Sequence, residues 1–170
     1  MVLSFQRFIF TSLLLLWTLL FSDAAISGPP ADYPFNNYDN GLAAAKQNNK
    51  YIFIYYGREG CGYCDKTNKE SFSQAKVKQV YLNHYNLVYI DAEGGNRITL
   101  PNGEVITEMQ FGPRIKALVT PVFIFLEPSG KEIVKVPGFQ SERDLLNLHA
   151  YVEGEHYKTK TFNQFLEKKN

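Results

Sequence analysis

Residues 51–64 read YIFIYYGREGCGYC, and this stretch decides the fold. Its first six residues are β-branched or aromatic with no polar alternation, which is typical of a strand covered on both faces. Gly57 and Gly60 bracket a break in that strand, and Cys61 then opens an expected helix that also carries Cys64. The stretch therefore predicts a buried strand of a parallel or mixed sheet, with a cysteine pair where the strand meets a helix.

These two cysteines are the only ones in the chain, too few for a disulfide framework. A bridge between them closes so short a loop that it adds little stability. Thiol–disulfide exchange, by contrast, needs one thiolate that attacks and a second thiol that resolves the mixed disulfide. At the start of a helix, Cys61 lies near unsatisfied N–H groups and the positive end of the helix dipole, while Cys64 turns inward. Cys61 is the predicted nucleophile and Cys64 the resolving thiol, together forming a redox-active disulfide.

Metal binding is the alternative use of a Cys-x-x-Cys pair. Zinc needs four ligands, and the other candidates are carboxylates and the three histidines, His84, His149 and His156. The spacing of His149 and His156 falls outside the usual three to five residues. Copper(I) on two thiolates is chemically allowed, so a Cu(I)-binding thiol chaperone without reductase activity remains an alternative. We predict redox use, with no metal and no cofactor.

The rest of the chain predicts alternating helices and strands. The order is strand, helix, strand, then strand, strand, helix, which is the layout of an α/β fold with a central mixed sheet flanked by helices. Gly112-Pro113 is expected to break or kink the helix that contains it. The expected helices are a short one over 42–46 capped by Asp39 or Asn40, one after Cys61, one starting after Ser73 as N-cap, 106–116, one opening at Ser141, and 161–169; the further strands are 87–90, 122–126 and 132–136.

The length, the net charge and the N-terminal sequence limit the possible domain organisation and cellular compartment. The chain has 170 residues, enough for one domain, and its net charge of +1 provides no basic field for nucleic acid. We predict a signal peptide over 1–24, because Arg7 precedes an apolar stretch too short to cross a bilayer and small residues follow it. A flexible lead-in over 25–37 and the domain over 38–170 would follow. The protein would be exported: periplasmic in a Gram-negative cell, and otherwise secreted, or tethered by an uncleaved N-terminus.

Two motifs carry a family resemblance. Cys61-Gly62-Tyr63-Cys64 after the buried strand, and Thr120-Pro121 before the strand 122–126, resemble the thioredoxin superfamily. The resemblance implies a thioredoxin fold, a cis-proline at Pro121 facing the cysteines, and a Thr120 backbone free to pair with substrate. Gly62 and Tyr63 would support the active site.

The closer resemblance is to exported thioredoxin-like proteins of the SoxW type, over about residues 38–168. It implies a monomeric oxidoreductase that reduces or exchanges disulfides of other exported proteins and is recharged by a membrane dithiol donor. The segments that look alike, besides the two motifs, are 51–56, 86–91, 122–123, 128–131, 137–138 and the tail 157–166.

The departures from cytosolic thioredoxins concern the direction of the reaction. Gly60 stands where they carry tryptophan, and Tyr63 where they carry proline. Their buried acid falls on Tyr55 and its lysine partner on Leu87, so the proton relay to the resolving thiol is absent or replaced. The tetrad and Thr120 resemble those of periplasmic disulfide isomerases. A disulfide isomerase or oxidase is therefore the alternative of the same class.

Overall fold

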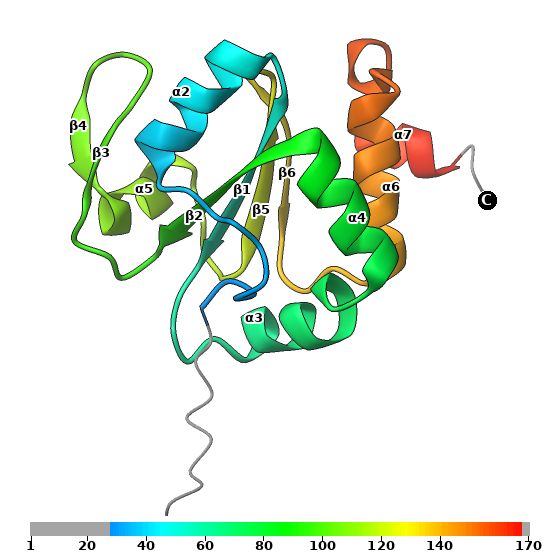
Figure 1. Ribbon diagram of the computed structural model, residues 1–170, viewed down its shortest axis with the longest axis horizontal. Helices are drawn as coiled ribbons and strands as arrows, with labels where there is room; N and C mark the ends of the chain where they lie inside the picture. Colours follow the sequence, from blue (N-terminus) through cyan, green and yellow to red (C-terminus); the bar gives the residue numbers. More distant parts are fainter. Residues whose placement is uncertain (1–27, 168–170) are drawn as a thin grey trace, which may run out of the picture.

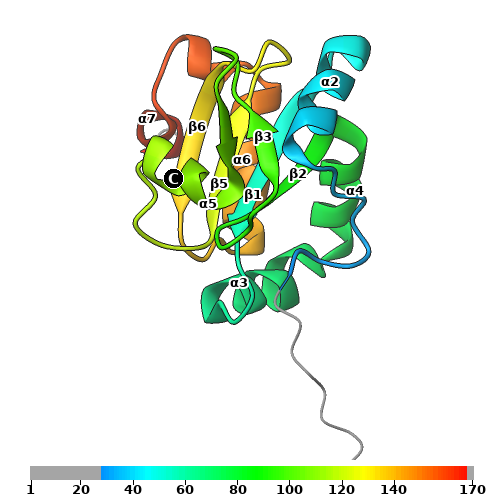
Figure 2. The same ribbon diagram turned by 90° about the vertical axis from the view of Figure 1, so that its left-hand side faces the viewer.

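The computed structural model describes residues 28–167, and a four-stranded mixed sheet forms its centre (Figure 1). The order across the sheet is β2-β1-β5-β6, and Figure 2 shows these strands side by side. Strand β1 runs parallel to β2 and antiparallel to β5, and β5 runs antiparallel to β6. The predicted central mixed sheet is confirmed. The strands are β1 (Tyr51–Gly57), β2 (Tyr85–Asp91), β5 (Val122–Leu126) and β6 (Glu132–Pro137).

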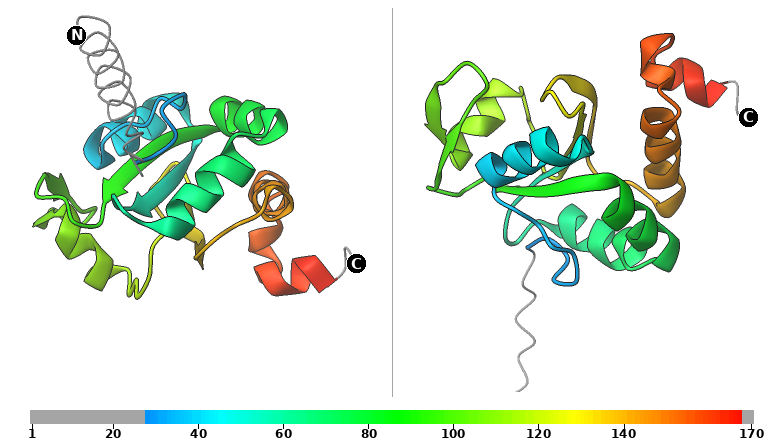
Figure 3. Two further views of the ribbon diagram at one scale, coloured as in Figure 1. Left: turned by 90° about the horizontal axis from the view of Figure 1, so that it is seen from below. Right: turned by 45° about the horizontal axis from the view of Figure 1, so that its top comes forward.

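Helices cover both faces of this sheet. In Figure 3 α5 lies on the opposite side of the molecule from α6 and α7. Helix α3, which carries Cys64, continues directly into a turn of π-helix, η1, and α4 follows. The helices are α2 (Tyr38–Asn48), α3 (Gly62–Thr67), η1 (Asn68–Phe72), α4 (Ala75–His84), α5 (Glu108–Arg114), α6 (Glu142–Glu153), the 3-10 turn η2 (His156–Lys158) and α7 (Phe162–Glu167).

The alternation of side chains along β1 divides the core into two halves. Phe53 and Tyr55 point into one half, which α3, α4 and α6 cover and which is largely aromatic. Ile52, Ile54 and Tyr56 point into the other half, which α2 and α5 cover. All five side chains are buried, so β1 is covered on both faces as the apolar run predicts. This burial fixes the end of β1, from which the cysteine pair follows.

The segment 106–116 differs from the expected single helix. It begins as strand β4 (Val105–Thr107), which pairs with β3 (Arg97–Thr99) in a separate two-stranded sheet. The helix starts only at Glu108, where the Gln110 side chain accepts a hydrogen bond from the Thr107 N–H at 2.9 Å. Pro113 lies in the last turn, so it ends α5 and does not kink a longer helix.

Two helix starts also differ by a few residues from expectation. Helix α2 begins at Tyr38, because the Asn37 side chain accepts the Asn40 N–H at 2.9 Å and so caps the helix. Helix α4 begins at Ala75, so its N-cap residue is Gln74 and not the expected Ser73. The Ser73 hydroxyl instead donates to the Lys69 carbonyl and belongs to the end of η1.

The described part of the expected lead-in packs on the domain. Tyr33 is buried, and its hydroxyl donates to the Phe72 carbonyl at 2.7 Å. Asn36 pairs with the edge of β2, since its N–H donates to the Leu87 carbonyl and its carbonyl accepts from the Tyr89 N–H. The packed part of the chain thus starts before residue 38. The predicted signal peptide, 1–24, lies outside the described residues.

Within residues 28–167 no helix has the length and apolar character needed to span a membrane.

Candidate active site

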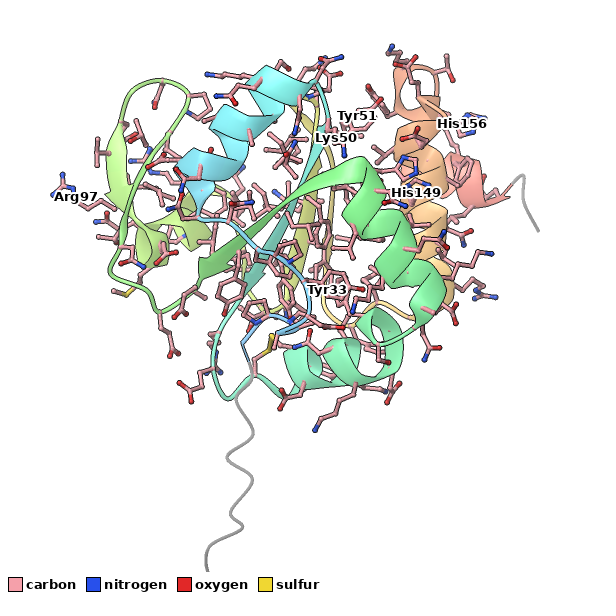
Figure 4. All side chains as sticks on the ribbon, in the orientation of Figure 1. Tyr33, Lys50, Tyr51, Arg97, His149 and His156 are labelled. Atoms are coloured by element: carbon pink, nitrogen blue, oxygen red, sulfur yellow. A yellow bond between two sulfur atoms is a disulfide. The ribbon has the colours of Figure 1, made fainter. Side chains whose placement is uncertain are left out.

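The cysteine pair lies at the carboxyl end of β1, at the start of α3. Cys61 is the N-cap residue of α3, and its sulfur is bonded to that of Cys64 (Figure 4). The two Cα atoms are 5.2 Å apart, and the side chains are 5% and 1% exposed. Both cysteines are therefore buried, and Cys61 is slightly the more exposed residue of the two.

A hydrogen-bond donor is aimed at the Cys61 sulfur. The Cys64 N–H points at the Cys61 Sγ, with 3.2 Å between nitrogen and sulfur. This N–H is one of the groups that a helix leaves without an intrahelical partner at its start. In the reduced protein such a donor stabilises a thiolate at Cys61, because hydrogen bonds to a charged acceptor are stronger than those to a neutral one.

The Thr120-Pro121 step lies beside the pair although it is far from it in sequence. The Thr120–Pro121 peptide bond is cis. The Thr120 hydroxyl donates toward the Cys61 Sγ at 3.3 Å. Pro121 is buried, and its carbonyl accepts the Gly138 N–H at 2.7 Å, which ties this step to the end of β6. The fold therefore brings Cys61, Cys64, Thr120 and Pro121 together.

The two residues between the cysteines face outward. Tyr63 is 63% exposed, and a Cβ placed on Gly62 would meet no heavy atom within 4 Å. The Tyr63 carbonyl accepts the Thr67 hydroxyl at 2.8 Å, which holds the first turn of α3. Gly62 and Tyr63 therefore lie on the protein surface next to the two buried cysteines.

A neutral tyrosine occupies the space next to Cys64. A Cβ added at Gly57 would lie 2.7 Å from the Tyr55 ring and 3.5 Å from the Cys64 Sγ. The ring and the sulfur therefore both lie close to Gly57. The Tyr55 hydroxyl donates to the Asn68 Oδ1 at 3.2 Å. Burial raises the pKa of Tyr55 well above its usual value, so this side chain stays neutral. Leu87, in the neighbouring strand, adds no charge.

Sequence reasoning missed Asn68, which joins three segments at the site. Its side chain accepts from Tyr55 and donates to the Gly28 carbonyl at 2.8 Å, while its N–H bonds to the Cys64 carbonyl. Nothing in the spacing around Asn68 indicates this role, because the position depends on the π-helical turn.

The histidines that the zinc alternative requires lie elsewhere. His84 of α4 and His149 of α6 pack edge to face, with 4.8 Å between ring centres, and the His84 Nδ1 lies 3.3 Å from a Glu153 carboxylate oxygen. Burial lowers the pKa of His149, next to the Tyr85 hydroxyl. Figure 4 labels His149 and His156 at the end of the molecule remote from the disulfide. Among residues 28–167, no three His, Cys, Asp or Glu side chains are grouped to hold a metal ion.

A mixed sheet flanked by helices, with a Cys-x-x-Cys disulfide where β1 meets α3, defines the class of thioredoxin-fold proteins. The chain belongs to the thioredoxin-like family, since the family's sequence model for the thioredoxin-like domain matches residues 38–153.

Individual relatives agree with this assignment. The chain is 31% identical over 118 residues to the thiol:disulfide interchange protein DsbD of two strains of Campylobacter jejuni. That match covers 68% of this chain and 18% of those longer proteins. A thioredoxin-fold protein from Helicobacter pylori superposes with a TM-score of 0.60 at 17% identity, covering 78% of this chain and 92% of the other. A thioredoxin from Thermus thermophilus gives 0.56 at 21% identity, covering 69% and 85%.

Proposed function

We propose that this protein is an exported thiol–disulfide oxidoreductase that reduces or exchanges disulfides in other exported proteins. The observation that carries the proposal is the Cys61–Cys64 disulfide at the start of α3, with the Thr120 hydroxyl on the Cys61 sulfur. Cys61 and Cys64 are the proposed catalytic residues. Gly62, Tyr63, Thr120 and Pro121 are proposed to hold the substrate beside them.

The proposed reaction starts from the reduced protein. The Cys61 thiolate attacks one sulfur of a substrate disulfide, forming a mixed disulfide and releasing the other sulfur as a thiolate. Cys64 loses its proton and attacks the Cys61 sulfur, which expels the second substrate thiolate and forms the Cys61–Cys64 disulfide. Two electrons pass from the protein dithiol to the substrate disulfide, and the substrate thiolates take up protons from solvent.

A reductase in an oxidising compartment must be reduced again after each turnover. The proposed donor is a membrane dithiol protein, which would return two electrons by the same exchange in reverse. The 31% identity to part of a thiol:disulfide interchange protein supports a place in such a pathway. Assignment to the SoxW type, action as a monomer and a periplasmic location in a Gram-negative cell are parts of the same proposal.

One observation favours isomerisation or oxidation as a second candidate function. Tyr55 places a neutral side chain next to Cys64, where cytosolic thioredoxins have an acid. Without a carboxylate to take the Cys64 proton, the mixed disulfide at Cys61 would persist longer before resolution. A long-lived mixed disulfide gives the substrate time to exchange its own cysteines. The Cu(I) alternative is distinguished by stoichiometric Cu(I) binding without reduction of insulin disulfides.

Trapping tests the proposal. Replacing Cys64 by alanine removes the resolving thiol, so the mixed disulfide should accumulate on Cys61. We expect the C64A protein, mixed with an oxidised cysteine-containing peptide, to gain the mass of one peptide strand, reversibly with dithiothreitol. The matched C61A variant keeps only the nearly inaccessible Cys64, 1% exposed in the native protein, and should trap little. Equal trapping by the two variants, or none by C64A, would contradict the assigned roles.

A further inference from the structure

A short N-terminal segment contacts both ends of the π-helical turn that follows α3. We call residues 28–36, drawn in blue in Figure 1, the strap. The Gly28 carbonyl accepts a hydrogen bond from the Asn68 side chain at 2.8 Å, and the Tyr33 hydroxyl donates to the Phe72 carbonyl at 2.7 Å. Asn68 and Phe72 are the first and the last residue of η1. The strap therefore fixes this turn at its two ends.

The strap is itself packed on the sheet. The Asn36 N–H donates to the Leu87 carbonyl of β2 at 2.9 Å. The Phe35 ring packs edge to face on the Tyr55 ring of β1, with 6.1 Å between the ring centres. The Gly28 carbonyl thus belongs to a segment that is anchored to two strands of the sheet.

Asn68 joins the strap to the sheet and to the helix of the resolving cysteine. Its Oδ1 accepts the Tyr55 hydroxyl at 3.2 Å, and its N–H bonds to the Cys64 carbonyl. Tyr55 is fully buried, and its ring lies close to Gly57, as the Cys64 sulfur does. The bond to the Cys64 carbonyl belongs to the helix backbone, whereas the two side-chain bonds cross to β1 and the strap. The Asn68 side chain therefore ties the C-terminal end of α3 to two segments that are distant in sequence.

The resolving step of disulfide exchange depends on the position of the Cys64 sulfur. In a mixed disulfide at Cys61, the Cys64 thiol loses its proton to water, and the thiolate attacks the Cys61 sulfur. The Cys61–Cys64 bond forms while the bond to the substrate sulfur breaks, and the substrate leaves as a thiolate with that electron pair. A displacement of about 1 Å between reacting atoms can slow a reaction by about a hundredfold.

We propose that Asn68 is a positioning residue for this resolving step. Through its bonds to Tyr55 and the strap, its side chain holds α3 so that the Cys64 sulfur stays within reach of the Cys61 sulfur. The inference rests on the proposed function and deepens it. The first step does not need this tie, because a free substrate adapts its position to Cys61. The second step does need it, since two sulfurs of the same folded chain must meet.

The two steps are measured separately with glutathione disulfide as the substrate. Reduced protein is mixed with it, samples are quenched with acid, and mass spectrometry follows the reduced, glutathione-bound and internally oxidised protein over time. The N68A variant loses the side-chain bonds to Tyr55 and Gly28 and keeps its backbone N–H. We expect its rate constant for resolution to fall about tenfold and its rate constant for attack to change less than about twofold.

A serine of the same turn provides the matched control. Ser71 is buried, and its hydroxyl donates to the Gln140 carbonyl at 2.7 Å, so S71A also removes a bond from η1 to a distant segment. That bond reaches the residue before the N-cap of α6, and S71A should leave both rate constants near their native values. Y55F removes a partner of the Asn68 side chain and should slow resolution by itself. Added to N68A, it should slow resolution little further, because both substitutions remove the same contact.

The outcomes separate this inference from the proposed function. Native-like resolution by folded N68A, or equal slowing by S71A, would overturn the positioning role and leave the oxidoreductase proposal intact. Should N68A fail to fold, Y55F decides, and native-like resolution by Y55F would overturn the role in the same way. If the native protein forms neither the glutathione-bound nor the internally oxidised species, the oxidoreductase proposal falls and this inference with it.

Discussion

Replacing Cys61 by serine should slow reduction of protein disulfides by about three orders of magnitude or more, the scale seen when a catalytic nucleophile is removed. A serine hydroxyl is not ionised near neutral pH and cannot form a disulfide, so the first exchange step is lost. Cys64 does not compensate, because only 1% of it is exposed beside Tyr55. The measurement is the rate of insulin precipitation with dithiothreitol as the reductant.

The matched control for C61S is the serine variant of the other cysteine. C64S keeps the attacking thiol and should therefore release one substrate thiol per protein molecule in a single turnover. Multiple turnover should be slow, because the mixed disulfide then waits for an external thiol. Retention of more than about a tenth of native activity by C61S would contradict the assignment of Cys61 as nucleophile.

Replacing Phe53 by alanine should lower the free energy of unfolding by about 3–5 kcal/mol, the range for large buried aromatic residues. Phe53 is fully buried at the centre of β1. Its ring lies 4.9 Å from that of Tyr81 and 5.1 Å from that of Phe125, centre to centre, so truncation opens a cavity between α4 and the sheet. Equilibrium unfolding in urea measures the change.

A second alanine variant makes the Phe53 prediction specific. L118A removes a side chain of similar hydrophobicity from a position that is 95% exposed, so its effect should stay within about 0.5 kcal/mol. Losses of similar size for F53A and L118A would contradict the placement of the aromatic half of the core.

The sheet was predictable because its central strands obey one strong rule. Residues 51–56 and 122–126 are apolar without alternation, and both strands are covered on two faces in the structure. The β3–β4 hairpin was missed, although Pro101-Asn102-Gly103 between two β-branched runs is a turn signal. Its strands are only three residues long. Because α5 begins at Glu108, directly after β4, the sequence of β4 was interpreted as part of that helix.

The site was predictable in its chemistry and less so in its surroundings. The spacing of Cys61 and Cys64 after a buried strand indicates thiol–disulfide exchange. Few other functions need a single pair of cysteines at the junction of a strand and a helix. The contact of Tyr55 with Asn68 depends on a π-helical turn that no spacing rule predicts. The left-handed conformation of Lys116, just after α5, is likewise not predictable from the sequence, because a lysine seldom adopts it.

The reduction potential of the Cys61–Cys64 couple tests the central claim most directly. The protein is equilibrated with mixtures of reduced and oxidised dithiothreitol or glutathione, free thiols are alkylated, and the reduced fraction is measured by mass. We predict a reversible two-electron transition between about −270 mV, the value for thioredoxin, and about −120 mV, the value for DsbA. A potential below about −300 mV, as in structural disulfides, would contradict the claim that this pair exchanges with substrates.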